Sequence, residues 1–243
     1  MVPGVDVHRA GSRATTRHDG VTTRHSFSSG HHYDPANTSY GLLLANDEHL
    51  VSAGAGFPAH EHRDVLVVTW VLEGVLRHED STGHAGLVRP GSVQLLSAGS
   101  GVGHSEHEGG RPGAALRFVQ TWVVPDAPGG ASRYEQQQLA PGLLDGTLAP
   151  VASGLARHRA AVALRLDSRG AALHAGVLAA GCAIELPEAP YVHVQVVRGG
   201  AELEGAGALA EGDAVRLTAT GGRLTATGPC EVLVWEMHAV PGA

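Results

Sequence analysis

Residues 57–62 read FPAHEH and residues 97–106 read SAGSGVGHSE, so each end of this stretch carries two metal-competent side chains two positions apart. The first pair is His60 and His62, and the second is His104 and Glu106. Residues i and i+2 of a β-strand project from the same face, so each pair points one way if its segment is extended. Two such strands, folded over a common interior, bring all four side chains together.

Three imidazoles and one carboxylate are a ligand set for a transition metal. Iron, nickel, copper, zinc and manganese accept these ligands, whereas magnesium and calcium prefer oxygen-rich sites. We therefore predict one divalent transition metal in the chain, with these ions and cobalt as candidates. Its expected ligands are His60, His62, His104 and Glu106.

Between the two pairs, residues 65–72 (VLVVTWVL) are apolar or β-branched on both faces, which predicts a central strand covered on both sides. Glu73-Gly74 interrupts this run and residues 75–79 resume it, as in a β-hairpin. Farther out, short apolar segments recur about every 8 to 12 residues with Gly and Pro between them. The pattern predicts an all-β sandwich or barrel, in which only residues 134–139 could form a short helix.

The second half of the chain repeats the rhythm of the first. Residues 191–200 (YVHVQVVRGG) reproduce the strand, glycine break and returning strand of residues 66–76, which indicates a duplicated barrel. The copy has no H-x-H pair and no counterpart of the second pair, so we expect it to be metal-free and structural. The expected units are a loosely held arm (1–21), a metal-binding domain (22–136), a linker (137–160) and a metal-free domain (161–243).

Composition limits the partners and the compartment. The formal net charge is −7 and the arginines are scattered, so the chain lacks a basic surface for direct nucleic-acid binding. No apolar run approaches the about 20 residues of a membrane span, and the polar N-terminus lacks a signal-peptide core. Cys182 and Cys230 have no C-x-x-C spacing, which suits reduced thiols better than a disulfide. We expect a cytoplasmic monomer without membrane contact.

At these residues the chain resembles the pirin family, whose members are bicupins of the cupin superfamily. Pirins take their carboxylate ligand from an S-A-G-x-G-x-x-H-S-E motif, which residues 97–106 match. Many pirins have a Glu near position 66, where this chain has Leu66. The similarity runs through most of residues 22–136, whereas the second half resembles the family only in strand rhythm and in residues 191–194 (YVHV). The first cupin motif, G-x5-H-x-H with a distant Gly, is matched by Gly54, His60, His62 and Gly74.

The resemblance implies two cupin (jelly-roll-like) β-barrels in tandem, with mononuclear iron in the N-terminal barrel and a degenerate C-terminal barrel. Some bacterial pirins show quercetinase (quercetin 2,3-dioxygenase) activity on a small planar aromatic substrate and O2. Other pirins act as metal-dependent regulators that bind a protein partner, and fold kinship alone does not choose between these functions. In the enzyme, Glu106 is the expected catalytic residue, as acceptor of a substrate hydroxyl proton. A third hypothesis is a bicupin that has lost its metal.

Several other residues have two interpretations. The chain has 16 histidines, so isolated ones are expected to be packed or surface residues. His78 is assigned to that class, in a solvated hairpin end at residues 78–80. Arg63 is equally compatible with orienting a ligand and with a structural salt bridge. The residues that either line the pocket mouth or belong to the core are Phe57, Trp70 and Leu95.

Overall fold

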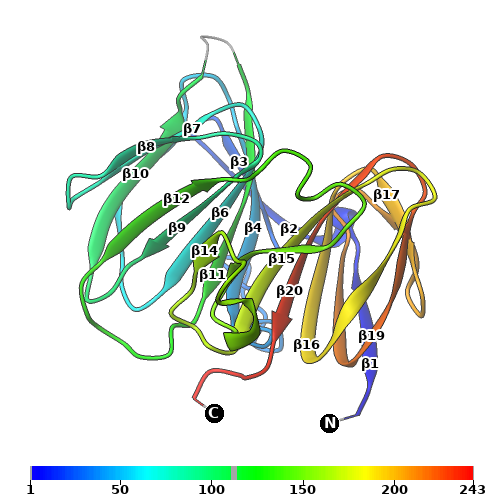
Figure 1. The fold of residues 1–243 in the computed structure, drawn as a ribbon. Helices are drawn as coiled ribbons and strands as arrows, with labels where there is room; N and C mark the ends of the chain where they lie inside the picture. Colours follow the sequence, from blue (N-terminus) through cyan, green and yellow to red (C-terminus); the bar gives the residue numbers. More distant parts are fainter. Residues whose placement is uncertain (1, 111–113, 243) are drawn as a thin grey trace. The chain divides into compact units, whose positions relative to one another are not determined.

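The structure is a computed structural model that describes residues 2–110 and 114–242 (Figure 1). Met1, residues 111–113 and Ala243, which fall in three of the expected segments, lie outside the described residues. Strands dominate, and the two described helices are short 3-10 turns, η1 (Ala10–Ser12) and η2 (Ala156–His158). The all-β prediction is confirmed.

The chain divides into two compact units. The N-terminal unit consists of Ala14–Ser39 and Leu43–Leu139. The C-terminal unit consists of Met1–Arg13, Tyr40–Leu42 and Ala140–Ala243. Each unit is therefore built mainly from one half of the sequence.

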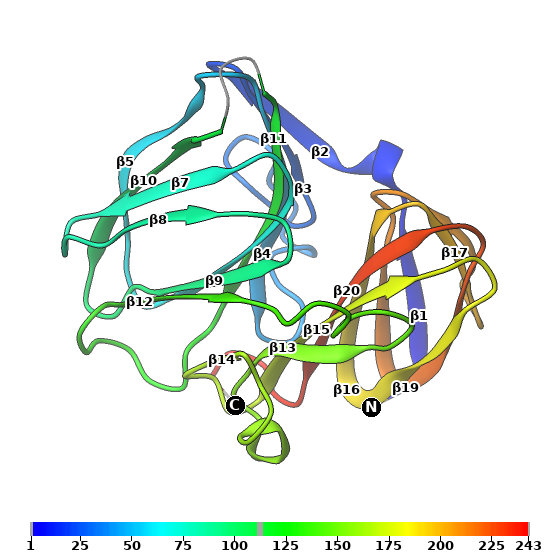
Figure 2. The same cartoon turned by 45° about the horizontal axis from the view of Figure 1, so that its top comes forward.

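The N-terminal unit contains two antiparallel sheets (Figure 2). The four-stranded sheet has the order β5-β10-β7-β8. Its strands are β5 (Gly56–His62), β10 (Val102–Glu108), β7 (Leu76–Asp80) and β8 (Ala85–Val88). The seven-stranded sheet has the order β12-β9-β6-β11-β4-β3-β2. Its strands are β12 (Arg133–Gln138), β9 (Ser92–Ser97), β6 (Leu66–Glu73), β11 (Leu116–Val123), β4 (Leu43–Val51), β3 (Val21–His25) and β2 (Ala14–His18).

Strand β6 is the central strand that the sequence predicts. It lies between β9 and β11, and all of its residues except Glu73 are buried. Its run of Val and Leu fits a position covered on both faces, because such a strand has no solvent side for polar residues. This prediction is confirmed.

A polar row crosses one face of the seven-stranded sheet. Cross-strand pairing aligns Asp47 with Gln120, Gln120 with Thr69, and Thr69 with Gln94. On β6, β9 and β11 the neighbouring positions of the same face are apolar and belong to two separate hydrophobic clusters, one with Val71 and Phe118 and the other with Val67 and Leu96. Burying polar groups between two apolar clusters costs free energy, so packing alone does not explain this row and it is a candidate part of a functional site.

The C-terminal unit is one nine-stranded sheet with the order β14-β13-β15-β20-β16-β19-β17-β18, in which β1 also pairs with β19. All its pairings are antiparallel except that of β13 with β14. Alternate residues of β16, such as Val192, Val194 and Val196, build its hydrophobic core. The strands are β1 (Gly4–His8), β13 (Ala149–Ser153), β14 (Leu164–Arg165), β15 (Ala171–Leu178), β16 (Ala183–Arg198), β17 (Gly200–Leu203), β18 (Gly207–Ala210), β19 (Ala214–Ala226) and β20 (Cys230–Met237).

Three expectations about chain segments are wrong. The arm expected at residues 1–21 contains β1 and β2, which pair with β19 and β3. The linker expected at residues 137–160 contains β13, which pairs with β15. The helix expected at residues 134–139 is absent from the structure, in which residues 134–138 belong to β12, because pairing with β9 overrides the helical preference of Glu and Gln. The partner of β1 is the distant strand β19, and that of β13 lies beyond the expected linker, so local patterns did not reveal these pairings. By contrast, β2 and β3 form a local hairpin around Asp19 and Gly20.

A buried carboxylate in the C-terminal unit collects three cationic or ionisable side chains. Glu236 is 1% exposed and contacts Arg157, His174 Nε2 at 3.1 Å and His238 Nε2 at 2.6 Å. Burial alone raises the pKa of Glu236, but hydrogen bonds from His174, Arg157 and His238 outweigh it and hold the pKa well below its ordinary value of 4.5. The carboxylate is therefore ionised at neutral pH and stabilises the folded state.

Replacing Glu236 with Gln is expected to lower the free energy of unfolding at pH 7 by about 1–3 kcal/mol, because hydrogen bonds to a charged acceptor are lost. The pKa of Glu236 is lower in the folded state than in the unfolded state, so its ionised carboxylate stabilises the fold fully above pH 4.5. This stabilisation is lost as the pH falls through the folded pKa. The difference from wild type should therefore shrink between pH 5 and pH 3 in urea titrations. Glu185→Gln, at a side chain 74% exposed, is the matched control. A difference that stays constant down to pH 3 contradicts the prediction.

Candidate metal centre

Two neighbouring antiparallel strands, β5 and β10, position the predicted ligands. Their register places His60 opposite His104, and a bulge between His104 and Glu106 shifts the pairing so that Glu106 lies opposite Phe57. The strands approach closely at Gly56, where a Cβ atom would lie 2.3 Å from the Glu106 carbonyl oxygen. Glycine at this position is therefore required for the strand pairing that aligns the two ligand pairs.

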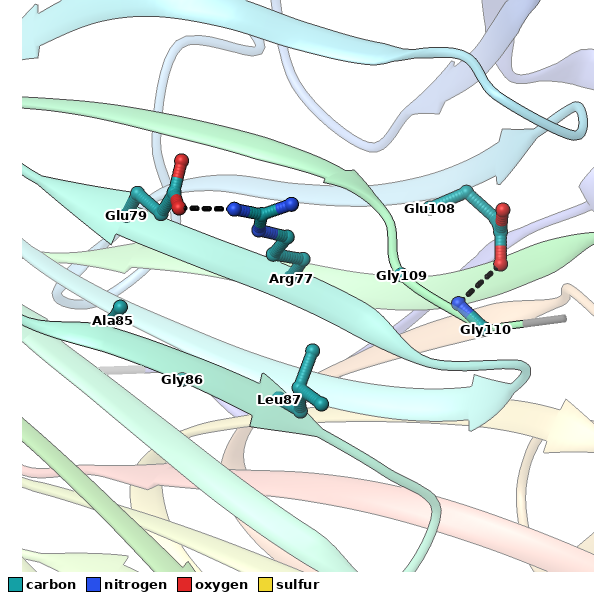
Figure 3. Close-up of a pocket in the computed structure, with 8 residues that line it drawn as sticks. All are labelled: Arg77, Glu79, Ala85, Gly86, Leu87, Glu108, Gly109 and Gly110. Atoms are coloured by element: carbon teal, nitrogen blue, oxygen red, sulfur yellow. Dashed lines mark hydrogen bonds and ion pairs between the residues drawn. The ribbon is translucent and has the colours of Figure 1, made fainter.

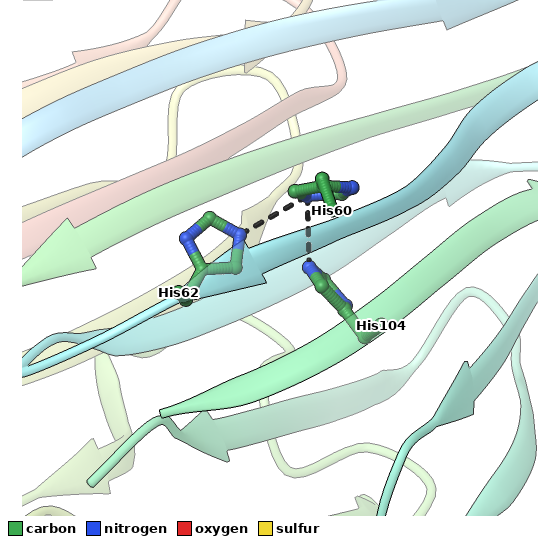
Figure 4. Close-up of side chains that lie close together, drawn as sticks. All are labelled: His60, His62 and His104. Atoms are coloured by element: carbon green, nitrogen blue, oxygen red, sulfur yellow. Dashed lines mark hydrogen bonds between the residues drawn. The ribbon is translucent and has the colours of Figure 1, made fainter. Parts of the chain in front are cut away.

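The three imidazoles converge through their Nε2 atoms (Figure 4). His60 Nε2 lies 3.1 Å from His62 Nε2 and 3.0 Å from His104 Nε2. Metal–nitrogen bonds are about 2.1 Å long, so two nitrogens at right angles around one ion are about 3.0 Å apart. The observed spacing fits a shared ion.

The protonation states of the imidazoles also fit metal binding. Burial, followed by the nearby His60, lowers the pKa of His62 to about 4. Burial, followed by His60 and His62, lowers the pKa of His104 to about 3. Both rings are neutral at pH 7, as a metal ligand must be. His60 Nδ1 donates to the Pro58 carbonyl at 2.9 Å, which leaves Nε2 as the free acceptor.

Glu106 has an unsatisfied buried oxygen. It is 1% exposed, and Oε2 accepts a hydrogen bond from Gln120 Nε2 at 2.8 Å. Within the described part of the chain, Oε1 has no hydrogen-bond partner. Burial raises the pKa of Glu106 to about 7, partly offset by hydrogen bonds from Gln120 and Gln94. A cation beside Oε1 removes the cost of burying this oxygen unpaired, so the residues present fit a metal ion.

Two overlapping groups of side chains have metal-binding geometry among the residues that the structure describes. One contains His60, His62 and His104, and the other contains His78, His104 and Glu106, with the ligand atoms of each group within 4.8 Å of one another. The structure thus brings the three predicted histidines together and places Glu106 beside His104. It also adds His78.

Residues 78–80 lie at a hairpin end, as predicted, because β7 pairs with β8, and Asp80 Oδ1 accepts hydrogen bonds from the Thr82 and His84 backbone. The prediction that this end is solvated is wrong. His78 is fully buried, and the Asp80 side chain is 1% exposed. The His78 ring stacks on Tyr134 with ring centroids 4.5 Å apart. Strand alternation in β7 explains the difference, since Leu76 and His78 face inward while Arg77 and Glu79 face outward. That alternation was readable from the sequence, but the burial of the strand's inner face was not.

His78 forms a chain of contacts behind His104. Its Nδ1 lies 3.4 Å from His104 Nδ1, and its Nε2 lies 3.4 Å from Asp80 Oδ2. With His104 Nε2 facing His60, the His104 Nδ1–H points to His78, and the His78 Nε2–H points to the carboxylate. Burial tends to raise the pKa of Asp80, but hydrogen bonds from Thr82 and His84 lower it to about 2, so this carboxylate stays ionised. Such outer partners fix the tautomer and orientation of a metal-binding imidazole.

Replacing His78 with Ala is therefore expected to weaken metal affinity about 10- to 100-fold, as loss of an outer-shell partner does elsewhere. Competition titration against a chelator of known affinity measures the change. Glu79→Ala, on the outward face of the same strand, is the matched control and should keep wild-type affinity. Equal metal affinity in His78→Ala and the control counts against this role.

A cavity of about 250 Å³ opens beside the ligands. Its lining residues are Thr16, Thr23, His25, Ser29, Asp47, His49, Phe57, His60, Glu106, Gln120 and Trp122. The two interpretations of the aromatic and apolar residues are now distinguished. Phe57 lines the cavity, whereas Trp70 and Leu95 are buried in the core.

A larger surface groove of about 620 Å³ runs over the outward face of β7 and β8 (Figure 3). Arg77, Glu79 and Leu87 line it, and they alternate with the inward-facing His78 along the strands. The groove therefore lies on the other side of the four-stranded sheet from the histidines. No helix within residues 2–110 and 114–242 is long and apolar enough to cross a membrane.

Comparison with known proteins identifies the family. The Pirin family model matches residues 7–123. A Mycobacterium tuberculosis protein named "Putative quercetin 2,3-dioxygenase Rv0181c" is 46% identical over 243 residues, covering 100% of this chain and 98% of that protein. An Escherichia coli K12 protein named quercetin 2,3-dioxygenase is 33% identical over 154 residues, covering 58% of this chain and 65% of that protein.

The fold is similar to that of a solved pirin structure. The crystal structure of the Escherichia coli bacterial pirin YhhW in complex with nickel(II) superposes with a TM-score of 0.86 at 26% sequence identity. The similarity covers 98% of this chain and all of the YhhW chain. The expected cupin fold is confirmed by this similarity. The chain belongs to the pirin family.

Proposed function

We propose that this chain is a metal-dependent dioxygenase that cleaves flavonols such as quercetin with O2. The proposed ligands of its single divalent metal are His60, His62, His104 and Glu106. The observation that carries the proposal is the unpaired, buried Glu106 Oε1 close to converging imidazole nitrogens, at the wall of a cavity. The names of the Mycobacterium and Escherichia relatives support the reaction class.

When bound, the metal supplies Lewis acidity and the capacity for redox chemistry. The chain supplies the rest. Glu106 accepts the proton of the substrate hydroxyl, and Gln120 holds the carboxylate in place through its hydrogen bond to Oε2. Phe57 and Trp122 present aromatic rings to the cavity, which suits a planar substrate and excludes water.

Iron(II) is the metal that we propose first, because the pirin resemblance implies it. The Escherichia coli pirin YhhW binds nickel(II), so nickel is the next candidate. Copper, manganese, zinc and cobalt also accept three imidazoles and a carboxylate. Elemental analysis of protein purified without added metal distinguishes these ions.

Aerobic turnover of quercetin by metal-reconstituted protein tests the function. The expected result is oxygen consumption and loss of the flavonol with at least one of iron, nickel, copper or manganese, with carbon monoxide as a product. Protein without metal is the control and should be inactive. Absence of turnover with all four metals rejects the dioxygenase.

The alternative function is a non-enzymatic, metal-dependent regulator that binds a protein partner. The size of the cavity favours it, since about 250 Å³ lies below the roughly 300–1,000 Å³ of pockets that enclose drug-sized ligands. Thr16, on β2 within the expected arm, also lines the cavity and narrows it. Full metal loading combined with no binding of quercetin supports the regulator over the enzyme.

A further inference from the structure

A second polar group, separate from the proposed ligands, lines the same cavity. His25 on β3 lies between Asp47 on β4 and Thr16 on β2. Its Nδ1 is 3.0 Å from Asp47 Oδ2, and its Nε2 is 3.0 Å from Thr16 Oγ1. All three residues line the cavity with His60 and Glu106.

The carboxylate determines the tautomer of His25. An ionised carboxylate only accepts hydrogen bonds, so His25 Nδ1 carries the hydrogen that it donates to Asp47. The Nε2 atom of the neutral ring is then an acceptor, and the Thr16 hydroxyl donates to it. Asp47 therefore holds a hydrogen-bond acceptor in a fixed orientation at the cavity wall.

Sheet register connects this group to the proposed metal ligand. Asp47 is the cross-strand partner of Gln120, whose amide donates to Glu106. His25 and Glu106 are thus linked by neighbouring members of the polar row. Among the described residues, neither group with metal-binding geometry contains His25 or Asp47.

The His25–Asp47 pair is nearly closed off from solvent. His25 is 7% exposed, and the Asp47 side chain is 17% exposed. A hydroxyl group is the ligand group that matches a fixed nitrogen acceptor beside a Thr hydroxyl, because it can donate to the nitrogen and accept from the Thr.

We propose that His25, oriented by Asp47, binds a ring hydroxyl group of the substrate. This contact is additional to the hydroxy-ketone of a flavonol, its adjacent hydroxyl and ketone groups, which the proposed metal would bind. The substrate hydroxyl donates to His25 Nε2 in place of the Thr16 hydroxyl, which turns to donate to the substrate oxygen. The site then selects polyhydroxylated aromatic compounds over relatives that carry the hydroxy-ketone alone. This inference rests on the proposed function, because it assumes that the substrate enters this cavity.

Binding of two flavonols tests the proposal. Quercetin and 3-hydroxyflavone share the hydroxy-ketone, but only quercetin has further ring hydroxyls. Wild-type, metal-loaded protein is expected to bind quercetin about 10-fold tighter, because its ring hydroxyl donates to His25 Nε2 and accepts from Thr16, which makes two hydrogen bonds where the site without this hydroxyl has one. In His25→Ala the preference is expected to fall to within about twofold, through loss of quercetin affinity alone. Equilibrium titration under nitrogen measures both dissociation constants.

Two further variants separate positioning from folding. Asp47→Asn keeps the size of the side chain but not its charge, so it should lose part of the preference. His18→Ala, at a side chain 85% exposed on β2, should keep all of it. Metal content and thermal unfolding of each variant show whether the N-terminal unit is intact.

The outcomes judge the two proposals separately. Equal weakening of both flavonols in His25→Ala, an unchanged preference, or no preference in wild type overturns the role of His25. Oxygen consumption by the same protein preparations, measured separately in air with quercetin, tests the dioxygenase independently. The predicted preference for quercetin without oxygen consumption supports the role of His25 and rejects the dioxygenase. Turnover of quercetin without any binding preference supports the dioxygenase and rejects the role of His25.

Discussion

Replacing His104 with Ala is expected to abolish metal binding by the N-terminal unit. His104 is the residue common to both groups with metal-binding geometry, and its Nε2 and Nδ1 face His60 and His78. Loss of an outer-shell partner alone costs about 10- to 100-fold in affinity, and loss of a direct ligand should cost more. The metal-to-protein ratio after dialysis, measured by elemental analysis, should fall from near one in wild type to background.

Thermal unfolding gives a second measure of the same change. A ligand that binds only the folded state stabilises it by mass action, by about 2.7 kcal/mol at 100 times its dissociation constant. Added metal should therefore raise the unfolding midpoint of wild type and leave that of His104→Ala unchanged. The control is His31→Ala, because His31 is an exposed histidine of the same unit. Equal metal content in His104→Ala and wild type removes the proposed site.

The orientation of the two side chains within each ligand pair could be predicted because it depends on a local rule. His60 and His62 are two positions apart on β5, and strand alternation orients both without any knowledge of the fold. The family motif supplied the relation between the pairs. The structure adds the physical reason, which is that β5 and β10 are antiparallel neighbours with His60 opposite His104.

The residues that support the ligands could not be predicted in this way. Gln120 lies in a strand of mostly apolar and aromatic residues, and its partner Glu106 is on the other sheet. The roles of His78 and Asp47 could not be predicted for the same reason. His78 contacts His104, which is 26 residues away in sequence, and Asp47 contacts His25, which is 22 residues away. A polar residue on the inward face of a buried strand was the available signal, but its meaning depends on which strands become neighbours.

Register also explains the departure at position 66. Leu66 and Thr69 are an odd number of residues apart on β6, so their side chains project from opposite faces. Thr69 belongs to the polar row that reaches Gln120 and Glu106, so position 66 faces away from the proposed ligands. Leu66 in place of Glu therefore removes no carboxylate from the face of the sheet that is directed to the proposed ligands. Glu106 is the carboxylate that shares metal-binding geometry with His104.

Replacing Glu106 with Gln is expected to reduce quercetin turnover per bound metal by about 10²- to 10⁴-fold, the usual contribution of a positioned proton acceptor. Gln has nearly the same shape and still accepts a hydrogen bond from Gln120 through its amide oxygen, so packing should be preserved. The variant loses only the charge and the basicity of the carboxylate. Metal affinity should fall as well, so rates have to be compared per bound metal at saturating metal.

Glu108→Gln is the matched control, because Glu108 lies two residues farther along β10, at the outward groove. It carries the same chemical change on the same strand and should retain wild-type turnover. Retention of more than a tenth of the wild-type rate by fully loaded Glu106→Gln would mean that another group accepts the proton. His25 is then the next candidate within the cavity, since Asp47 orients its ring through Nδ1 and Nε2 remains as an acceptor, and the double variant Glu106→Gln/His25→Ala should lose the remaining turnover.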